Sequence, residues 1–214
     1  MKIAMIGGTG DMGYGLALRW AQKGHDIVIG SRQIEKAEEA AQKAREAAGV
    51  QNITGMANAD AAAACELVVI SVLSAGHTAT VTSLKDIIKA KPVLDVTIPI
   101  AFGPLRYEPP AAGSNALETK AILGEDSQVA AGFHTVSATL LTNLEKAISG
   151  DVLIVGDEEP KKLTLQLAEE MGLRAFDAGS LVFSPTVEGQ TPMLIGMNKR
   201  YGSKHIGISL TGLP

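Results

Sequence analysis

The sequence has little of several features that mark particular classes of protein. It contains one cysteine, Cys65, which excludes an internal disulfide and is typical of a reducing compartment. Its longest apolar stretch, residues 67–73, is far shorter than the roughly 20 residues that a membrane-spanning helix needs. Its formal net charge is -4, which argues against nucleic acid as a partner because such proteins usually present a basic face.

We expect no export signal at the start of the sequence. Residues 1–6 are largely apolar, but glycines follow at once, so no apolar core of roughly 7–15 residues forms. We therefore expect a soluble cytoplasmic protein without a membrane partner. A chain of 214 residues suits one large domain, or one domain with a small appendage.

What is present is an alternation of short Val- and Ile-rich runs with longer helical patterns. The short runs predict strands at residues 2–6, 26–29, 52–56, 67–72 and 93–98. Three later runs, at residues 129–133, 152–155 and 174–177, should extend the same sheet. The longer patterns predict helices, among them residues 33–48, 77–90, 138–148, 160–171 and 192–201. Since runs such as residues 67–70 are apolar throughout, both faces of the sheet should be covered. The pattern predicts an α/β fold of Rossmann type, with a doubly wound, mostly parallel sheet.

Two regions depart from this alternation. Residues 103–113 contain three prolines and should form a loop at the carboxyl edge of the sheet, where α/β proteins bind ligands. After Gly179 the alternation stops. We therefore expect an extended nucleotide-binding domain over residues 1–180 and a small C-terminal lobe over residues 181–214.

A glycine-rich turn follows the first expected strand. Gly8, Gly10 and Gly13 form a G-x-G-x-x-G pattern between a strand and a helix, which is the context that a dinucleotide-binding turn requires. Glycines let the backbone approach a pyrophosphate, and the helix N-terminus supplies free N–H groups and a positive dipole end. A turn without a ligand is the simpler alternative.

The end of the second strand indicates which dinucleotide would bind. NAD-binding proteins place an acidic residue there to hold the ribose hydroxyls, whereas this sequence has Ser31 and Arg32, with Lys36 one helical turn later. Arg can bind a 2′-phosphate through paired hydrogen bonds. The sequence thus favours NADP over NAD, although Ser31 could instead cap the next helix while Arg32 is solvated.

The usual reductase and hydrolase motifs are missing. None of the three tyrosines is followed by a lysine four residues later, and no HExxH, CxxC or GxSxG pattern occurs, so the sequence supports neither a metal site nor acyl transfer. His134, at the end of an expected strand, is the one candidate catalytic residue, and a structural role is the alternative. A site without an obvious acid suits hydride exchange between two carriers.

Several of these segments together resemble the F420-dependent NADP reductase family. The resemblance covers essentially the whole chain and is carried by Gly7–Arg19, Gly30-Ser31-Arg32 with Lys36, Ile53-Thr54-Gly55-Met56, Phe133-His134-Thr135, Val187-Glu188 with Thr191-Pro192, and Ile206-Gly207-Ile208. It implies hydride transfer between reduced coenzyme F420, a deazaflavin, and NADP+. It also implies that residues 181–214 complete the deazaflavin pocket, and the apolar tail suggests a homodimer contact.

The resemblance also implies roles for single residues. The NADP pyrophosphate would be wrapped by Thr9, Gly10, Asp11 and Met12, and the 2′-phosphate held by Ser31, Arg32 and Lys36. The ribose and nicotinamide would meet Val72, Ile98 and Ala138, and the deazaflavin would meet Ile206. After the fourth strand the sequence departs from the Pro, Trp and His expected for the family, so the contact there falls to Gly76 or His77.

Three alternatives remain open at this point. A basic cluster at Lys199, Arg200, Lys204 and His205 either holds the acidic tail of the deazaflavin or is a solvated face at a helix end. The protein could instead reduce an imine or ketone, as pyrroline-carboxylate-type reductases do, with His77, His134 or water as proton donor. It could also bind NADP(H) without turnover.

Overall fold

An eight-stranded sheet crosses the whole molecule in the computed structural model, which describes residues 1–212. The strand order is β10-β9-β8-β5-β4-β1-β2-β3, and every neighbouring pair is parallel except β8 and β9. The strands are β1 (Lys2–Ile6), β2 (Asp26–Ser31), β3 (Ile53–Ala57), β4 (Leu67–Ile70), β5 (Pro92–Asp95), β8 (Gln128–Ala131), β9 (Asp151–Gly156) and β10 (Arg174–Asp177). The predicted doubly wound, mostly parallel sheet is confirmed.

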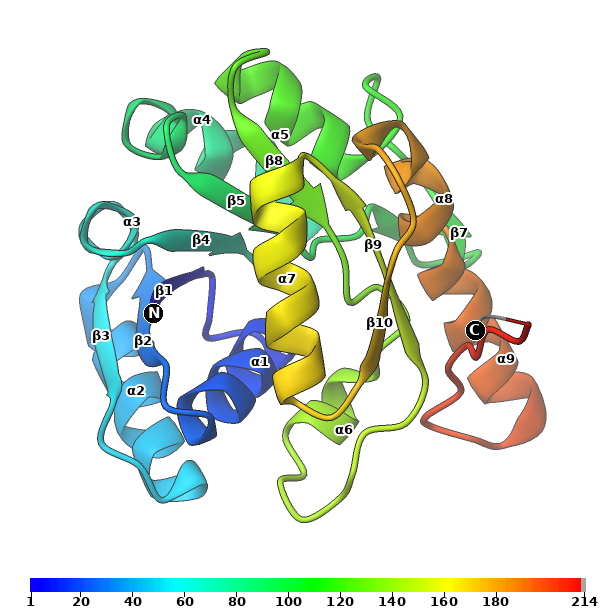
Figure 1. Cartoon of the computed structure of the whole chain (residues 1–214), viewed down its shortest axis with the longest axis horizontal. Coiled ribbons are helices and arrows are strands. Elements are labelled where there is room, and N and C mark those ends of the chain that lie inside the picture. Colours follow the sequence, from blue (N-terminus) through cyan, green and yellow to red (C-terminus); the bar gives the residue numbers. More distant parts are fainter. Residues whose placement is uncertain (213–214) are drawn as a thin grey trace.

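Helices cover both faces of this sheet (Figure 1). On one face lie α1 (Asp11–Gln22), α2 (Ile34–Ala48) and α7 (Glu158–Glu170), whose buried side chains pack with Ile3 and Met5 of β1. On the other lie α3 (Asn58–Ala64), α4 (His77–Ile88) and α5 (Asn115–Leu123), which pack with Ala4 and Ile6. Successive residues of β1 point to opposite faces, so an uninterrupted apolar strand supplies both cores.

The carboxyl ends of the strands differ in detail from the predicted ones. β4 ends at Ile70 and β5 at Asp95, so Val72 and Ile98 lie in the loops beyond the strands. β8 ends at Ala131, because Phe133 turns the chain with a φ of 66°, a left-handed conformation that a strand cannot contain. All three differences lengthen the loops along one edge of the sheet.

The predicted helix over residues 138–148 is wrong. Helix α6 (Ala138–Leu141) makes a single turn. The guanidinium of Arg19, from α1, then donates hydrogen bonds of 2.6–3.0 Å to the carbonyls of Leu140, Leu141, Asn143 and Lys146. These carbonyls are bound by a side chain 121–127 residues away in sequence, so the segment needs no further helical turns.

The expected loop at residues 103–113 includes part of a two-stranded ribbon. Strand β6 (Ile100–Ala101) pairs with β7 (Arg106–Tyr107), and helix α5 follows, which the sequence analysis did not predict. Ser114 caps α5 by accepting a 3.0 Å hydrogen bond from the N–H of Leu117. A serine followed by strong helix formers is the signal that could have revealed this helix.

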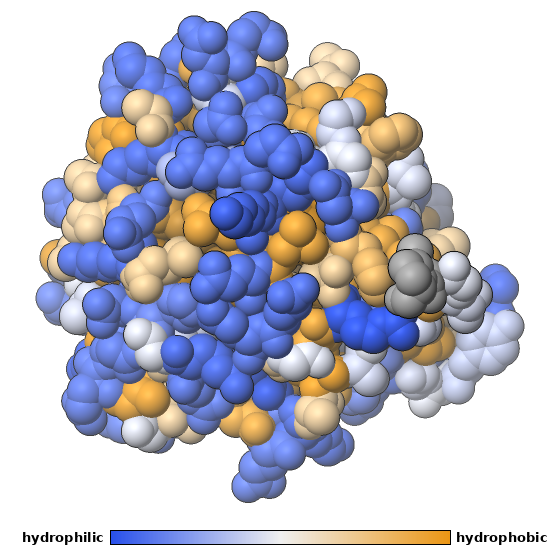
Figure 2. Space-filling view, in the orientation of Figure 1, coloured by the Kyte–Doolittle hydropathy of each residue, from blue (hydrophilic) through white to orange (hydrophobic). Residues whose placement is uncertain are grey.

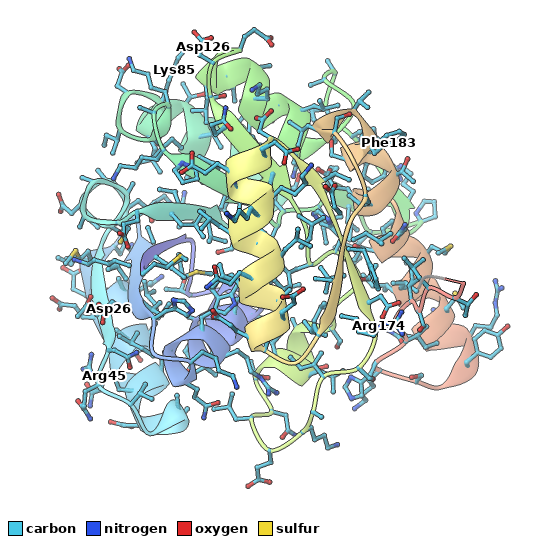
Figure 3. All side chains as sticks on the ribbon, viewed as in Figure 1. Asp26, Arg45, Lys85, Asp126, Arg174 and Phe183 are labelled. Carbon is cyan, nitrogen blue, oxygen red and sulfur yellow. The ribbon has the colours of Figure 1, made fainter. Side chains whose placement is uncertain are left out.

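The C-terminal segment forms a small lobe beside β9 and β7. It contains the single-turn η2 (Leu181–Phe183), α8 (Ser184–Glu188) and α9 (Gln190–Tyr201). The chain after α9 returns to the sheet, where the Ile208 carbonyl accepts from the N–H of Asp151 at 2.7 Å and Arg174 binds the Leu210 carbonyl at 3.1 Å (Figure 3). No helix within residues 1–212 has both the length and the apolar character that crossing a membrane requires. Residues 213–214 of the expected lobe lie outside the described residues.

Candidate functional site

The glycine turn joins β1 to α1 at the point where the strand order reverses, between β1 and β4. Gly7 has a φ of +77°, and a Cβ there would lie 2.6 Å from Cγ1 of Val72. A Cβ on Gly13 would overlap Oγ of Ser71. Glycine at both positions therefore lets the turn and α1 pack directly against the loop after β4. Val72 is thus brought against the turn, and its contact with the ribose and nicotinamide stays a prediction.

The N-terminus of α1 is open. Its N-cap, Gly10, provides no side-chain cap, and Thr9, Gly10 and Asp11 are exposed while Met12 is half-buried. A Cβ on Gly10 would meet only the Gly7 carbonyl, at 3.6 Å. Uncapped N–H groups and the positive end of the helix dipole here fit an anionic group such as a pyrophosphate.

Three polar side chains lie at the end of the neighbouring strand, β2. Arg32 and Lys36 are exposed, and Ser31 is half-buried. Ser31 Oγ accepts a 3.2 Å hydrogen bond from the N–H of Gln33, so it forms a local turn, whereas the N-cap of α2 is Gln33 itself. The turn leaves the cationic side chains of Arg32 and Lys36 exposed at the edge of the sheet, where they fit a phosphate group.

The structure distinguishes Gly76 from His77, the two residues considered for the coenzyme contact after β4. His77 is 1% exposed and its ring points into the interior, whereas Gly76 is half-buried and a Cβ there would meet no atom within 4 Å. Gly76 therefore borders open space, and the His77 side chain does not.

A buried polar network fills the space beneath this loop. The carboxylate of Asp95, 0% exposed, accepts from His77 Nε2 at 2.8 Å and from the Thr119 hydroxyl at 2.7 Å. It also accepts from the N–H of Thr97 at 2.9 Å and from its hydroxyl at 2.5 Å. Burial alone would raise the pKa of Asp95, but these hydrogen bonds and the charge of His77 hold it below its usual value.

His134, the candidate catalytic residue, is also buried. It is 3% exposed, and neither ring nitrogen has a hydrogen-bond partner among the described residues. Burial lowers the pKa of His134 to about 4, against the opposing charge of Asp95, so the ring is neutral at physiological pH. The ring lies in the interior beside the Asp95 network rather than at an open surface.

The segment around Ala138, expected at the nicotinamide, and the segment around Ile206, expected at the deazaflavin, lie together. Ser137 Oγ donates to the Lys204 carbonyl at 3.2 Å, and His205 Nδ1 lies 3.3 Å from Thr139 Oγ1. Ala138 and Ile206 are therefore brought to neighbouring positions although 68 residues separate them in sequence. Lys199, Arg200 and Lys204 are exposed, the first two in the last turn of α9.

The sequence and structure of this chain match known proteins over its full length. A family model described as NADP oxidoreductase, coenzyme F420-dependent, matches residues 2–99. The F420-dependent NADP reductase of Methanocaldococcus jannaschii is 42% identical, covering 100% of this chain and 99% of the relative, and that of Methanothermobacter thermautotrophicus is 39% identical, covering 100% and 96%.

The chain belongs to the F420-dependent NADP reductase family.

Solved structures agree with this fold. The crystal structure of a putative F420-dependent NADP reductase from Arthrobacter sp. FB24 superposes with a TM-score of 0.84 at 23% identity, covering 99% of this chain and 100% of that one. A pyrroline-5-carboxylate reductase from Coxiella burnetii gives 0.61 at 18% identity, and this chain covers only 67% of it. At these identities the likeness concerns the fold alone.

Two residues of the family resemblance acquire a structural explanation that the sequence analysis missed. The carboxyl group of Glu188 accepts from the N–H groups of Asn115 and Ala116, both at 3.0 Å, and so binds the N-terminus of α5. Thr191 donates a 2.6 Å hydrogen bond to the carbonyl of His134. The Val-Glu-x-x-Thr-Pro segment therefore connects the C-terminal lobe to the loops at the sheet edge.

Proposed function

We propose that this protein catalyses reversible hydride transfer between reduced coenzyme F420 and NADP+. The full-length match to relatives named F420-dependent NADP reductase carries the proposal. The site supports it, because an open glycine turn and two exposed cations lie on adjacent strands of one sheet edge.

The residues would divide the binding of NADP between them. The pyrophosphate would lie on the N-terminus of α1, against Thr9, Gly10, Asp11 and Met12. The 2′-phosphate would be held by Ser31, Arg32 and Lys36. The nicotinamide side would be bordered by Val72, Gly76, Ile98 and Ala138. Ile206 would contact the deazaflavin, and the nearby Lys199, Arg200 and Lys204 suit its acidic tail, although cations in the last turn of α9 also complement the helix dipole.

The bound coenzymes supply the redox chemistry, since the reduced deazaflavin gives up a hydride to NADP+ and a proton to solvent. The protein then has to bind and orient two ring systems. No described residue needs to act as a proton donor in this scheme. His134, neutral and buried, suits the packing of the loops better than proton transfer.

We also propose a cytoplasmic homodimer. The buried Cys65 thiol suits a reducing compartment. Five exposed large apolar side chains lie in the C-terminal lobe, at Val182, Phe183, Met193, Ile195 and Tyr201. On the face shown in Figure 2, hydrophobic residues gather near the start of α8, where Figure 3 labels Phe183. A second copy of the chain would cover them.

The test is to mix the purified protein with chemically reduced F420 and NADP+ and to follow both chromophores, with NAD+ as the control. Rapid exchange with NADP+ and little with NAD+ is the expected result. Tight NADPH binding without exchange would move the proposal to an imine or ketone reductase, or to a protein that binds NADP(H) without turnover if no acceptor is reduced.

A further inference from the structure

His77 is a buried histidine that lies between two carboxylates. It is the first residue of α4 and is 1% exposed. Its Nε2 lies 2.8 Å from Oδ2 of Asp95, and its Nδ1 lies 2.9 Å from Oε2 of Glu118. Ionised carboxylate oxygens only accept hydrogen bonds, so both ring nitrogens must donate and the ring is an imidazolium.

The charges around the ring agree with this protonation state. Burial alone would lower the pKa of His77, but Asp95 from β5 and Glu118 from α5 raise it above its ordinary value. Two further titratable groups lie around Asp95. Burial raises the pKa of Glu188 on α8 to about 8, and His134 is neutral. Asp95 and Glu118 are thus the charges that act on His77 within residues 1–212.

The imidazolium is connected to both loops of the nicotinamide side. Asp95, which it binds, accepts two hydrogen bonds from Thr97, the residue before Ile98. Asn115 Nδ2 then donates to the Thr97 hydroxyl at 2.8 Å and approaches Oγ of Ser74 at 3.5 Å. Ser74 lies two residues before Gly76. The buried charge of His77 is therefore linked through one network to Thr97 in the loop after β5 and to Ser74 in the loop after β4.

We propose that His77 is a positioning residue for NADP: as an imidazolium between Asp95 and Glu118, it holds the loops after β4 and β5 in the arrangement that receives the nicotinamide end. This inference rests on the proposed function, because it uses the NADP site assigned there. His77 acts through the loops and does not touch the coenzyme.

The direction of the pH effect follows from the charge. A group whose pKa is raised in the folded protein stabilises its arrangement below that pKa and loses the effect as the pH rises through it. A neutral His77 ring would donate a hydrogen bond from only one of its two nitrogens. The lone pair on the other nitrogen would then face the carboxylate of Asp95 or Glu118. NADPH affinity should therefore weaken as the pH rises through the pKa of His77.

The experiment uses Glu118→Gln, which removes one charge beside His77 and keeps the shape of the side chain. An opposite charge at this distance shifts a pKa by roughly 1–3 units, so the alkaline loss of NADPH affinity should begin about one pH unit lower than in the wild type. NADPH dissociation constants are measured from about pH 6 to about pH 10, together with the urea midpoint of the free protein.

Asp157→Asn is the matched control. Asp157 also pairs with α5, through Lys120 at 3.0 Å, but it lies outside the network of His77 and Asp95.

The outcomes separate the two proposals. A shifted profile in Glu118→Gln and an unshifted one in Asp157→Asn would support the positioning role. Superimposable profiles, or equal shifts in both variants, would overturn it and leave His77 a purely structural residue. A wild type that fails to bind NADPH would overturn the proposed NADP site, and this inference with it.

A second measurement tests the imidazolium without any coenzyme. The chain has four histidines, so ¹³C-labelled histidine gives four NMR signals, and His77→Gln identifies the signal of His77 by its loss. The signal should titrate above the ordinary histidine pKa of about 6.5, because Asp95 and Glu118 raise the pKa of His77. A ring that titrates at or below that ordinary value would overturn the proposal even if Glu118→Gln folds poorly.

Discussion

Arg32 lies exposed at the end of β2, beside the half-buried Ser31, and its guanidinium is the group best suited to a 2′-phosphate. Losing a hydrogen bond to a charged group costs roughly 1.5–3 kcal/mol. Arg32→Ala should therefore weaken NADP binding about 10- to 150-fold and leave NAD binding nearly unchanged, as measured by titration calorimetry.

The control for this prediction is Arg106→Ala, which removes an exposed arginine from β7, where it pairs with Glu108 at 2.6 Å. It changes the net charge equally and should leave both affinities unaltered. Equal losses of NADP and NAD affinity in Arg32→Ala would refute the 2′-phosphate role.

At the scale of single residues, the sequence predicts local motifs better than networks. The glycine turn and the Ser31-Arg32 pair lie within continuous segments, so their spacing alone indicates their role. The partners of Asp95 come from α4, α5 and the loop after β5, and no spacing in the sequence relates His77 to Thr119. His134 shows the same limit, because a histidine after a strand reads identically whether its ring faces solvent or the interior.

At the scale of elements, the close packing of α2 on β3 positions Lys36, one of the residues proposed to hold the 2′-phosphate. A Cβ on Gly55 of β3 would overlap the backbone of Ala37 and Glu38, in the second turn of α2. Gly55→Ala must push α2 away, and overpacking of this kind costs roughly 1–3 kcal/mol. We expect that loss in urea unfolding, and weaker NADP binding because Lys36 moves with α2.

Thr54→Ala, at an exposed position on the same strand, is the control and should change the unfolding free energy by less than about 0.5 kcal/mol. If the unfolding free energy of Gly55→Ala equals that of the wild type, β3 and α2 are packed less tightly than the structure shows.

Elements were predictable where apolar periodicity decides them. The buried strands of the main sheet, such as β4 and β9, follow from Val- and Ile-rich runs, because strands covered on both faces must be apolar. The edge strand β10 is partly exposed and contains neither residue type. Residues 138–148 carry helix-forming residues yet make one turn, because Arg19 from α1 binds their carbonyls. A contact between segments so far apart overrides local propensity, and no local pattern reveals it.

At the scale of the whole molecule, the strand order sets the order of the proposed coenzyme contacts. Along the sheet edge, β2 presents the cations, β1 the glycine turn, β4 and β5 the loops of the nicotinamide side, and β8 the segment that leads to Ala138. The tail after α9 meets that segment at Ser137. The two coenzymes would therefore approach one edge from opposite ends, with their rings meeting in between.

The C-terminal lobe lies at the end of this series of proposed coenzyme contacts. It carries exposed apolar side chains on α9, among them Met193, which is 53% exposed, and Ile195, which is 37% exposed. If a second copy covers them, a double variant Met193→Lys and Ile195→Lys should place charges in a buried interface and raise the dimer dissociation constant at least about tenfold. Analytical ultracentrifugation over a dilution series measures this. Ile34→Lys, at a 44% exposed apolar position on α2, is the control and should leave the constant unchanged. A monomeric wild type would contradict the homodimer, whereas a dimer that both variants leave intact would place its interface away from α9.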